Sequence, residues 1–295
     1  MKVNSLTITY LSKVTFGSLN GSDKEVDNIN PIKKITLSNG QELPYVSSQA
    51  LRRALRDSLV EMGFEKSEVQ EASAKKGAPK TLMNPVTYIE DDLFGYMDAA
   101  PGKDGEKGKS DVRTSPIRVE SLVALSEYKG DLDYATNFMA VEKGGDPNIF
   151  ESEIHSGIYR GTILIELDRI GTGKGFEEEE LDKEEKKKRV KAFIDALQNL
   201  WSSGRQTRFL SDISPKFIAA ACMKAKNPVF LEALQVDEQG KVNVEALKSV
   251  AEDYERFIDK HVFAGQKAVF QLPDSVKSLK EGFAEIHKWI DEIYA

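Results

Sequence analysis

One segment combines an amphipathic helix with a dense set of polar and basic side chains at its start, between positions 44 and 57. Its apolar residues recur at four-residue spacing and give the helix one stripe to bury against a core: Leu51, Leu55 and Leu59. Ser47 or Ser48 precedes the stripe, and a serine oxygen caps a first turn by accepting one of its unpaired N–H groups. The pattern predicts a helix that ends near Gly63.

The start of this helix has the features of a phosphate-binding surface. It offers backbone amides at the positive end of the helix dipole, and guanidinium groups follow within the next turns. The side chains that we expect there are Ser47, Ser48, Gln49, Arg52, Arg53 and Arg56. Composition alone leaves open the alternative that these arginines form an ordinary solvated face.

Length, composition and charge restrict the class of protein. The 295 residues, 40% hydrophobic and 30% charged, are sufficient for one large domain or two modest ones. The net charge of −7 argues against a generic nucleic-acid binder, which is basic overall. Much of the excess acid lies in the stretch 176–185, so a local basic groove remains compatible with the total. A single cysteine, Cys222, in an apolar run indicates a buried side chain.

Hydropathy predicts no membrane partner, because no apolar run approaches 18 residues. The first residues alternate like a strand and lack the long apolar centre of a signal peptide. We therefore expect a soluble protein of the cytoplasm.

Strands and helices are mixed along the chain without a βα repeat, which favours an α+β fold. The expected strands are 6–16, 160–168 and 216–223, with a hairpin over 33–44 that turns at Asn39-Gly40. A long helix is expected to begin in the acidic stretch 176–185 and to end near Trp201, and further helices are expected over 228–234, 243–260 and 275–293. The stretch 98–114 is rich in Gly, Pro and charge, and we expect a loop there that is mobile or is ordered only against a partner.

Motifs of common catalytic and cofactor sites are missing from the sequence. There is no GxGxxG after a strand and no Walker phosphate loop. The histidines, His155, His261 and His287, are far apart, and one cysteine makes zinc improbable. We therefore predict no catalytic residue, no metal and no cofactor.

The string Ser47-Ser-Gln-Ala-Leu-Arg-Arg-Ala-Leu-Arg56 resembles the first helix of the CRISPR Cascade backbone subunit, a member of the RAMP superfamily. Further stretches are similar to the DevR-type, type I-B branch of that family and follow its order along the chain. They are Asp91–Met97, Arg113–Pro116, Ile149–Tyr159 and Trp201–Asp212.

The resemblance implies a hand-shaped protein formed by one domain over residues 1–295. Its palm would be RRM-like, or ferredoxin-like, with a sheet covered by helices on one side. A finger region would be inserted at about 64–118, and a thumb hairpin would project from about 136–160.

The resemblance also implies a function without catalysis. Several copies would line up head to tail along one guide RNA (crRNA), grip its phosphates and present its bases to a target DNA strand. Phosphate contacts suit a scaffold for any guide, because they carry no sequence information. Each thumb would flip one base out at regular intervals, and other Cascade subunits would complete the assembly.

Carried over position by position, the resemblance assigns RNA contacts to the helix residues named above. It adds Ser18 and Asn20 in the loop after the first strand, and Arg205 and Arg208 as phosphate contacts. The thumb wedge is assigned to Phe138, Met139 and Ile154, for which ordinary core packing is an equal alternative.

Two other functions stay open at this point. Relatives in type III complexes cut RNA with a loop aspartate, and Asp23 or Asp27 would occupy that position in a metal-dependent endoribonuclease. The family label also suggests a DNA-binding autoregulator, although no helix-turn-helix pattern stands out.

Overall fold

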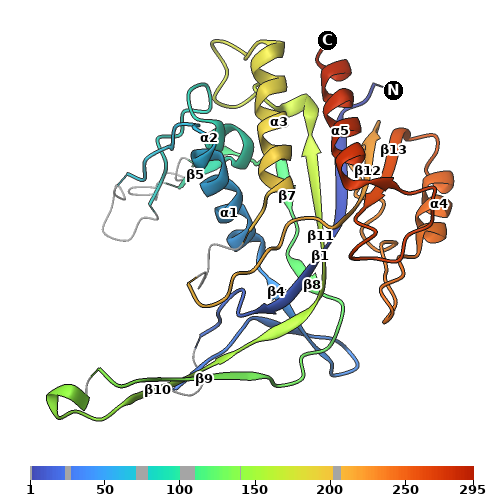
Figure 1. The fold of residues 1–295 in the computed structure, drawn as a ribbon. Coiled ribbons are helices and arrows are strands. Elements are labelled where there is room, and N and C mark those ends of the chain that lie inside the picture. Colours follow the sequence, from blue (N-terminus) through green and yellow to red (C-terminus); the bar gives the residue numbers. More distant parts are fainter. Residues whose placement is uncertain (1, 24–27, 71–78, 100–109, 140, 202–206) are drawn as a thin grey trace.

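A long N-terminal strand, β1 (Ser5–Gly17), organises the main sheet of this computed structural model. It pairs antiparallel with β11 (His155–Glu166) on one side and with β12 (Phe217–Met223) on the other. The residues that the structure describes are 2–23, 28–70, 79–99, 110–139, 141–201 and 207–295. Within them the protein is a mixed α+β fold, with one large sheet and few helices (Figure 1).

Nine strands form the main sheet of the described residues. Their order is β14-β13-β12-β1-β11-β8-β4-β3, and β7 also pairs with β11. The bounds of the remaining strands are β3 Lys34–Thr36, β4 Glu42–Val46, β7 Ile117–Val119, β8 Leu122–Ala124, β13 Ile258–Gly265 and β14 Lys277–Ser278.

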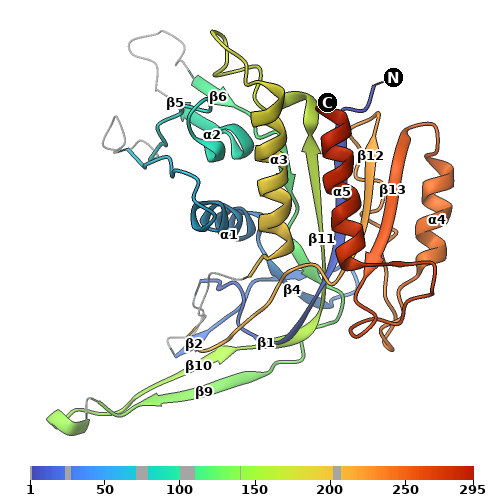
Figure 2. The same ribbon diagram turned by 45° about the horizontal axis from the view of Figure 1, so that its top comes forward.

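Alternation along the central strands sends side chains to two separate cores. Leu6 and Ile8 of β1 face the layer of α1 (Ser48–Glu61), α3 (Lys183–Gln198) and α5 (Leu279–Ile293), which lie side by side in Figures 1 and 2. Leu11 and Phe217 belong to the core on the opposite face, which α4 (Val244–Asp253) covers. The period-two pattern of a strand buried on both faces accounts for both layers.

A two-stranded ribbon projects from the body (Figures 1 and 2). It consists of β9 (Leu132–Asn137), the short 3-10 helix η1 (Val141–Lys143) and β10 (Asn148–Glu153). We call residues 132–153 the arm. Near the body, β2 (Ile29–Asn30) adds a third, parallel strand to β10.

A smaller unit lies beside α1 and α3. It contains α2 (Ile89–Phe94) and a hairpin of β5 (Tyr96–Ala99) and β6 (Ser110–Arg113). A second 3-10 helix, η2 (Leu167–Arg169), follows β11 directly.

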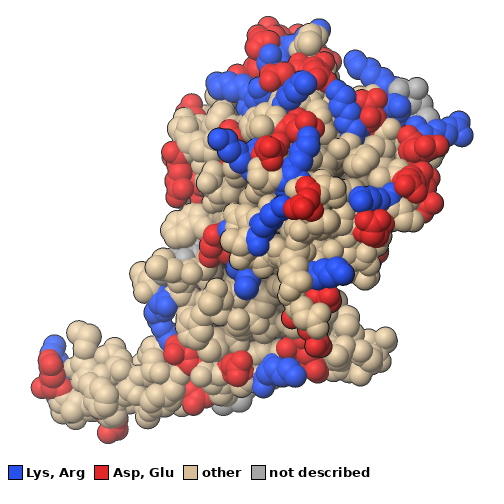
Figure 3. All heavy atoms as spheres, turned by 45° about the vertical axis from the view of Figure 1, so that its right-hand side comes forward, with Lys and Arg blue, Asp and Glu red and all other residues tan. Residues whose placement is uncertain are grey.

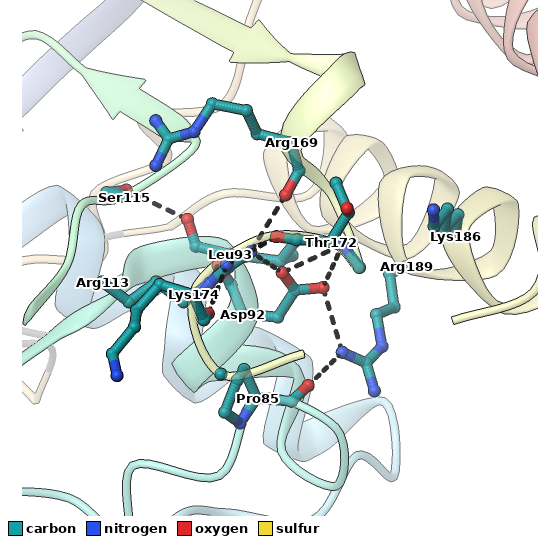
Figure 4. Close-up of polar contacts among 12 residues, drawn as sticks. Pro85, Asp92, Leu93, Arg113, Ser115, Arg169, Thr172, Lys174, Lys186 and Arg189 are labelled. Atoms are coloured by element: carbon teal, nitrogen blue, oxygen red, sulfur yellow. Dashed lines mark hydrogen bonds and ion pairs between the residues drawn. The ribbon is translucent and has the colours of Figure 1, made fainter. Parts of the chain in front are cut away.

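Asp92 of α2 is completely buried between two buried arginines, Arg113 and Arg189 (Figure 4). We call these three residues the Asp92 cluster. Arg113 Nη2 donates to Asp92 Oδ1, and Arg189 Nη1 donates to Asp92 Oδ2 at 3.0 Å. The backbone N–H of Gly171 donates to both carboxylate oxygens at 3.1 Å.

The remaining N–H groups of both arginines bind backbone carbonyls or an acid. Arg113 donates to the carbonyl oxygens of Asp92, Arg169, Thr172 and Lys174, at 2.8–3.1 Å. Arg189 donates to the carbonyls of Pro85 and Val86, both at 2.6 Å, and to Glu185 at 3.0 Å. The cluster therefore joins α2, β6, α3 and the loop after β11 with its buried polar groups paired.

The backbone conformation at position 95, directly after α2, requires glycine. Its φ is +67°, and a Cβ there would lie 2.1 Å from the carbonyl oxygen of Arg113. Only glycine fits this position, because it adopts a positive φ and leaves room for the β6 backbone.

Several sequence predictions are confirmed by these elements. The α+β class, the first strand, the 33–44 hairpin and the buried strand near 216–223 are all present. Cys222 is buried, and burial raises the pKa of its thiol to about 12. No helix of the described residues is both long and apolar enough to cross a membrane.

Other predictions were wrong near the C-terminus. Residues 228–234 form hydrogen-bonded turns instead of a helix. The helix expected over 243–260 ends at Asp253, and β13 begins at Ile258. Strand β13 supplies the antiparallel partner of β12, so tertiary pairing overrides local helix propensity there.

The long helix and the 98–114 loop also differ from expectation. Helix α3 begins at Lys183, after the cap residue Asp182, so the acidic run before it is not helical. The ends of the loop pair as β5 and β6, and the remaining positions 100–109 lie outside the described residues.

We predict that Asp92→Asn destabilises the fold by about 3–5 kcal/mol, because it leaves two buried guanidinium groups without a countercharge. The measurement is the free energy of unfolding in urea. Asp274→Asn is the matched control, since Asp274 pairs with Lys267 on the exposed surface, and it should leave the midpoint unchanged. Equal midpoints for both variants would contradict the role assigned to Asp92.

Candidate nucleic-acid interface

The loop after β1 is joined to the start of α1. The backbone N–H of Ser47 donates to Asn20 Oδ1 at 2.9 Å. Ser47 is the N-cap of α1, and its Oγ accepts from the N–H of Ala50 at 3.3 Å. Ser18, two residues before Asn20, is buried. The predicted cap is therefore confirmed at Ser47, and the loop after β1 lies against it.

The first amides of α1 are less available than the sequence suggested. Ser48 N–H donates to Ser121 Oγ at 3.1 Å, and Ser48 Oγ donates to the carbonyl of Val119 at 2.6 Å. With the Ser47 and Ala50 amides also paired, the expectation of free amides is wrong for these three positions. Gln49 is exposed and points its amide side chain to solvent. The β7–β8 segment takes the place that a ligand was expected to fill.

Arg52 is turned toward the neighbouring unit. Its Nη2 donates to the carbonyl of Phe94 at 2.6 Å. Its Nη1 donates to the carbonyl of Ile117 and to Ser115 Oγ, both at 3.2 Å. Burial, with a smaller contribution from Arg56, lowers the pKa of Arg52 to about 10. This guanidinium therefore joins α1 to α2 and β7.

Arg56 also has partners inside the chain. It lies 3.5 Å from Glu90 and over the ring of Phe94, at 4.5 Å from the ring centroid. Burial lowers the pKa of Arg56, and the Glu90 carboxylate opposes that shift. Its charge is therefore partly compensated.

Arg53 is the exposed member of the three. It forms a two-oxygen contact with Asp57 one turn later, at 2.8 Å to each oxygen. This hydrogen bond raises the pKa of Arg53. An exposed pair of this kind is weak and exchanges readily with an external anion. Arg53 and Gln49 are thus the two predicted contacts that α1 presents to solvent.

A second loop, described from residue 207, reaches the same end of β1. Phe209 packs on Phe16, with ring centroids 5.3 Å apart, and Ser211 Oγ lies 3.5 Å from the Phe16 carbonyl oxygen. Arg208 binds Asp133 of the arm. Arg205 lies outside the described residues. Of the two predicted loop arginines, the one that the structure describes is therefore paired with the arm.

The predicted wedge residues occupy two different places. Phe138 and Met139 follow β9 toward the far end of the arm and are 64% and 75% exposed. Ile154 lies at the other end, just after β10, where its N–H donates to the carbonyl of Asp131. It is half-buried, in keeping with the packing alternative.

Four contact residues of this region escaped the sequence analysis: Ser121, Asp133, Phe150 and Glu153. Each is a common residue type in a strand or turn. Three of them, Ser121, Asp133 and Glu153, contact partners at least 70 positions away, and Phe150 contacts Arg208 at a shorter separation. No local pattern marks such pairs.

The alternative nuclease sites gain no support from the described residues. Within the described ranges, no three His, Cys, Asp or Glu side chains could hold one metal ion. Asp23 is exposed, and Asp27 lies outside the described residues. His155 Nδ1 is 2.7 Å from Tyr159 Oη, and burial lowers the pKa of His155.

Blue and red side chains are interspersed over the body on the face in Figure 3, more densely toward its upper part. The arm is mainly tan in this view, with a few charged groups. On this face the described residues therefore form no broad surface of one charge.

Comparisons with known proteins agree on one family. The sequence of residues 8–246 matches the family described as CRISPR-associated negative auto-regulator DevR/Csa2. A relative from Myxococcus xanthus (strain DK1622), the CRISPR-associated protein Cas7/Cst2/DevR, is 27% identical over 239 residues, covering 75% of this chain and 73% of the relative.

Two solved structures share the fold. One, described as a CRISPR RNA-guided surveillance complex, aligns with a TM-score of 0.63 and 16% identity over 98% of this chain and 99% of its own. The other, described as the pre-nicking state of such a complex, gives 0.62 and 14% over 98% and 100%.

We predict unequal stability effects for two neighbouring arginines of α1. Arg52→Ala should cost about 2 kcal/mol, because it removes the donor to the carbonyl of Phe94 and one of the donors to the carbonyl of Ile117. Arg53→Ala should stay within about 0.5 kcal/mol, since it removes one exposed pair. Urea unfolding measures both, and equal losses would show that the arginines have similar structural roles.

Proposed function

This chain belongs to the DevR/Csa2 family of CRISPR-associated proteins, and from that membership we propose that it is a non-catalytic backbone subunit of a Cascade surveillance complex. Several copies bind one crRNA in the cytoplasm, contact each other head to tail and present the guide to a target DNA strand. Other Cascade subunits complete the assembly. The motif stretches quoted above favour the type I-B branch.

The arm is the observation that carries this proposal. Large apolar side chains are exposed along it and around its end: Leu132, Tyr134, Phe138, Met139, Val141 and Ile149. A ribbon of this kind is marginally stable alone in water, and contiguous exposed apolar residues mark a surface that a partner covers. We assign the arm as the thumb, with Phe138 and Met139 as the wedge that unstacks a base.

The rest of the chain suits the same assignment. The main sheet with its layer of α1, α3 and α5 acts as an RRM-like palm, and residues of about 64–118 act as fingers within one hand-shaped domain. The Asp92 cluster attaches the fingers to the palm through buried side chains.

The RNA backbone is gripped at the end of β1. Gln49 and Arg53 bind phosphate directly from the exposed side of α1. Ser18, Asn20, Ser47 and Ser48 shape the surface, and Arg52 and Arg56 add positive charge beside the helix N-terminus. Such contacts bind any guide sequence, and base pairing supplies discrimination.

We predict that the purified chain assembles in steps on RNA. Light scattering should show a mass that rises by one chain at a time as single-stranded RNA lengthens, because each copy covers a fixed number of nucleotides. Duplex DNA of equal length is the control and should give no steps.

Other outcomes point to other functions. RNA bound without steps, or not at all, would contradict the backbone assignment. Specific binding of duplex DNA would favour the autoregulator, and metal-dependent RNA cleavage abolished by Asp23→Ala would favour the nuclease.

A variant with Phe138→Ser and Met139→Ser should bind RNA and lose the regular spacing of protected nucleotides.

We predict that Gln49→Ala with Arg53→Ala weakens RNA binding equally for all guide sequences. The plot of log affinity against log salt should lose about one unit of slope, because one charged phosphate contact, that of Arg53, disappears. Arg256→Ala is the matched control, since Arg256 is exposed between α4 and β13, away from α1. A loss that depends on RNA sequence would contradict a backbone grip.

A further inference from the structure

The arm touches the body at its root, and there one side chain contacts both of its strands. Arg208, from the loop after α3, donates from Nη2 to Asp133 Oδ2 of β9. The same guanidinium lies over the ring of Phe150 of β10, at 5.0 Å from its centroid. An arginine can do both at once because its plane stacks on a ring while its edge donates to a carboxylate.

Arg208 is itself held by the body. Its guanidinium lies 5.1 Å from the ring centroid of Phe209, which is buried and packs on Phe16 of β1. Gly17 follows Phe16 in β1 and lies close to the same loop, because a Cβ at this position would lie 2.7 Å from Ser211 Oγ. The end of β1 is thus connected through Phe209 and Arg208 to both strands of the arm.

The opposite edge of the root has a separate attachment. Lys34 Nζ donates to both carboxylate oxygens of Glu153, at 2.8 and 2.9 Å, and lies 4.4 Å from the Tyr128 ring centroid. The backbone N–H of Ile32 donates to Glu153 as well, at 2.9 Å. Strand β2 also pairs with β10 at the root, so β10 keeps these attachments when the Arg208 contact to Asp133 of β9 is removed.

We propose that Arg208 is a positioning residue that fixes the direction of the arm relative to the sheet, and that it does so through Asp133 and Phe150. Its guanidinium is already used by the chain, so phosphate binding is not its main task. Both partners of the ion pair are about one-third exposed, so the contact adds little to global stability. Its effect is on orientation, because a small rotation at the root moves the far end of the arm by a large distance.

The importance of this direction rests on the proposed function. In a head-to-tail array, the direction of each arm decides which part of the neighbouring copy it reaches. Arg208 would then set the spacing of the array without touching RNA.

The test measures arm direction on the full chain without RNA. Spin labels on Asp146→Cys, in the β9–β10 connection, and Lys288→Cys, on α5, report one distance by double electron–electron resonance. Both positions are exposed, whereas native Cys222 is buried. We expect one narrow distribution in the parent chain and a broader, shifted one in Arg208→Ala, with an unchanged melting temperature.

Further variants separate orientation from simple loss of structure. Arg208→Asp combined with Asp133→Arg should restore the narrow distribution, and Arg208→Lys should restore it only in part, because lysine lacks the planar fork. Arg256→Ala should have no effect. An unchanged distance distribution in Arg208→Ala would overturn the proposal.

RNA binding gives an independent readout. A positioning residue leaves the salt dependence of binding unchanged, whereas loss of a phosphate contact lowers its slope by about one. A lower slope with an unchanged distance distribution would identify Arg208 as a phosphate ligand instead. Failure of the chain to bind RNA would contradict the proposed function and leave the distance result valid.

Discussion

The buried carboxylate of Asp92 connects the smaller unit of α2, β5 and β6 to helix α3 and to the loop after β11. It binds arginines from β6 and α3, and these arginines in turn bind backbone carbonyls in the loop before α2 and in the loop after η2. A buried charge is tolerated only when it is paired and hydrogen-bonded. The position of α2 beside α1 depends on this pairing, and so do the carbonyl of Phe94 and the ring that Arg52 and Arg56 contact.

The arginines of this chain therefore divide by what surrounds them. Arg113 and Arg189 are buried and structural, Arg52 and Arg56 join α1 to α2, and Arg53 faces solvent beside Gln49. A count of arginines in a helix overestimates the charge that a ligand meets, because neighbouring carbonyls and acids use part of it. The net charge of −7 is compatible with an RNA scaffold for the same reason. Phosphate binding depends on a few oriented positive groups and not on the total charge of the chain.

Local patterns in the sequence predicted the elements whose stability is local. The Ser47 cap, the leucine stripe of α1 and the Asn39-Gly40 turn each depend on neighbours a few positions away. The motif resemblance predicted the family. The pairs Asp92–Arg189 and Arg208–Asp133 join residues about 100 and 75 positions apart and left no periodic signal. The predicted helix over 243–260 extended into the start of β13, because the partner strand β12 is required to define β13.

The hairpin of β5 and β6 closes on itself through four paired positions, from Tyr96 with Arg113 to Ala99 with Ser110. Its base is clamped by the Asp92 cluster and by the positive φ of Gly95. Because both strands are held at this base, lengthening the chain between Ala99 and Ser110 costs little, since each doubling of a closed loop costs only about 0.6 kcal/mol in entropy. This hairpin is a natural point of attachment for engineering, where an inserted reporter or effector domain would be carried by the subunit without entering its cores.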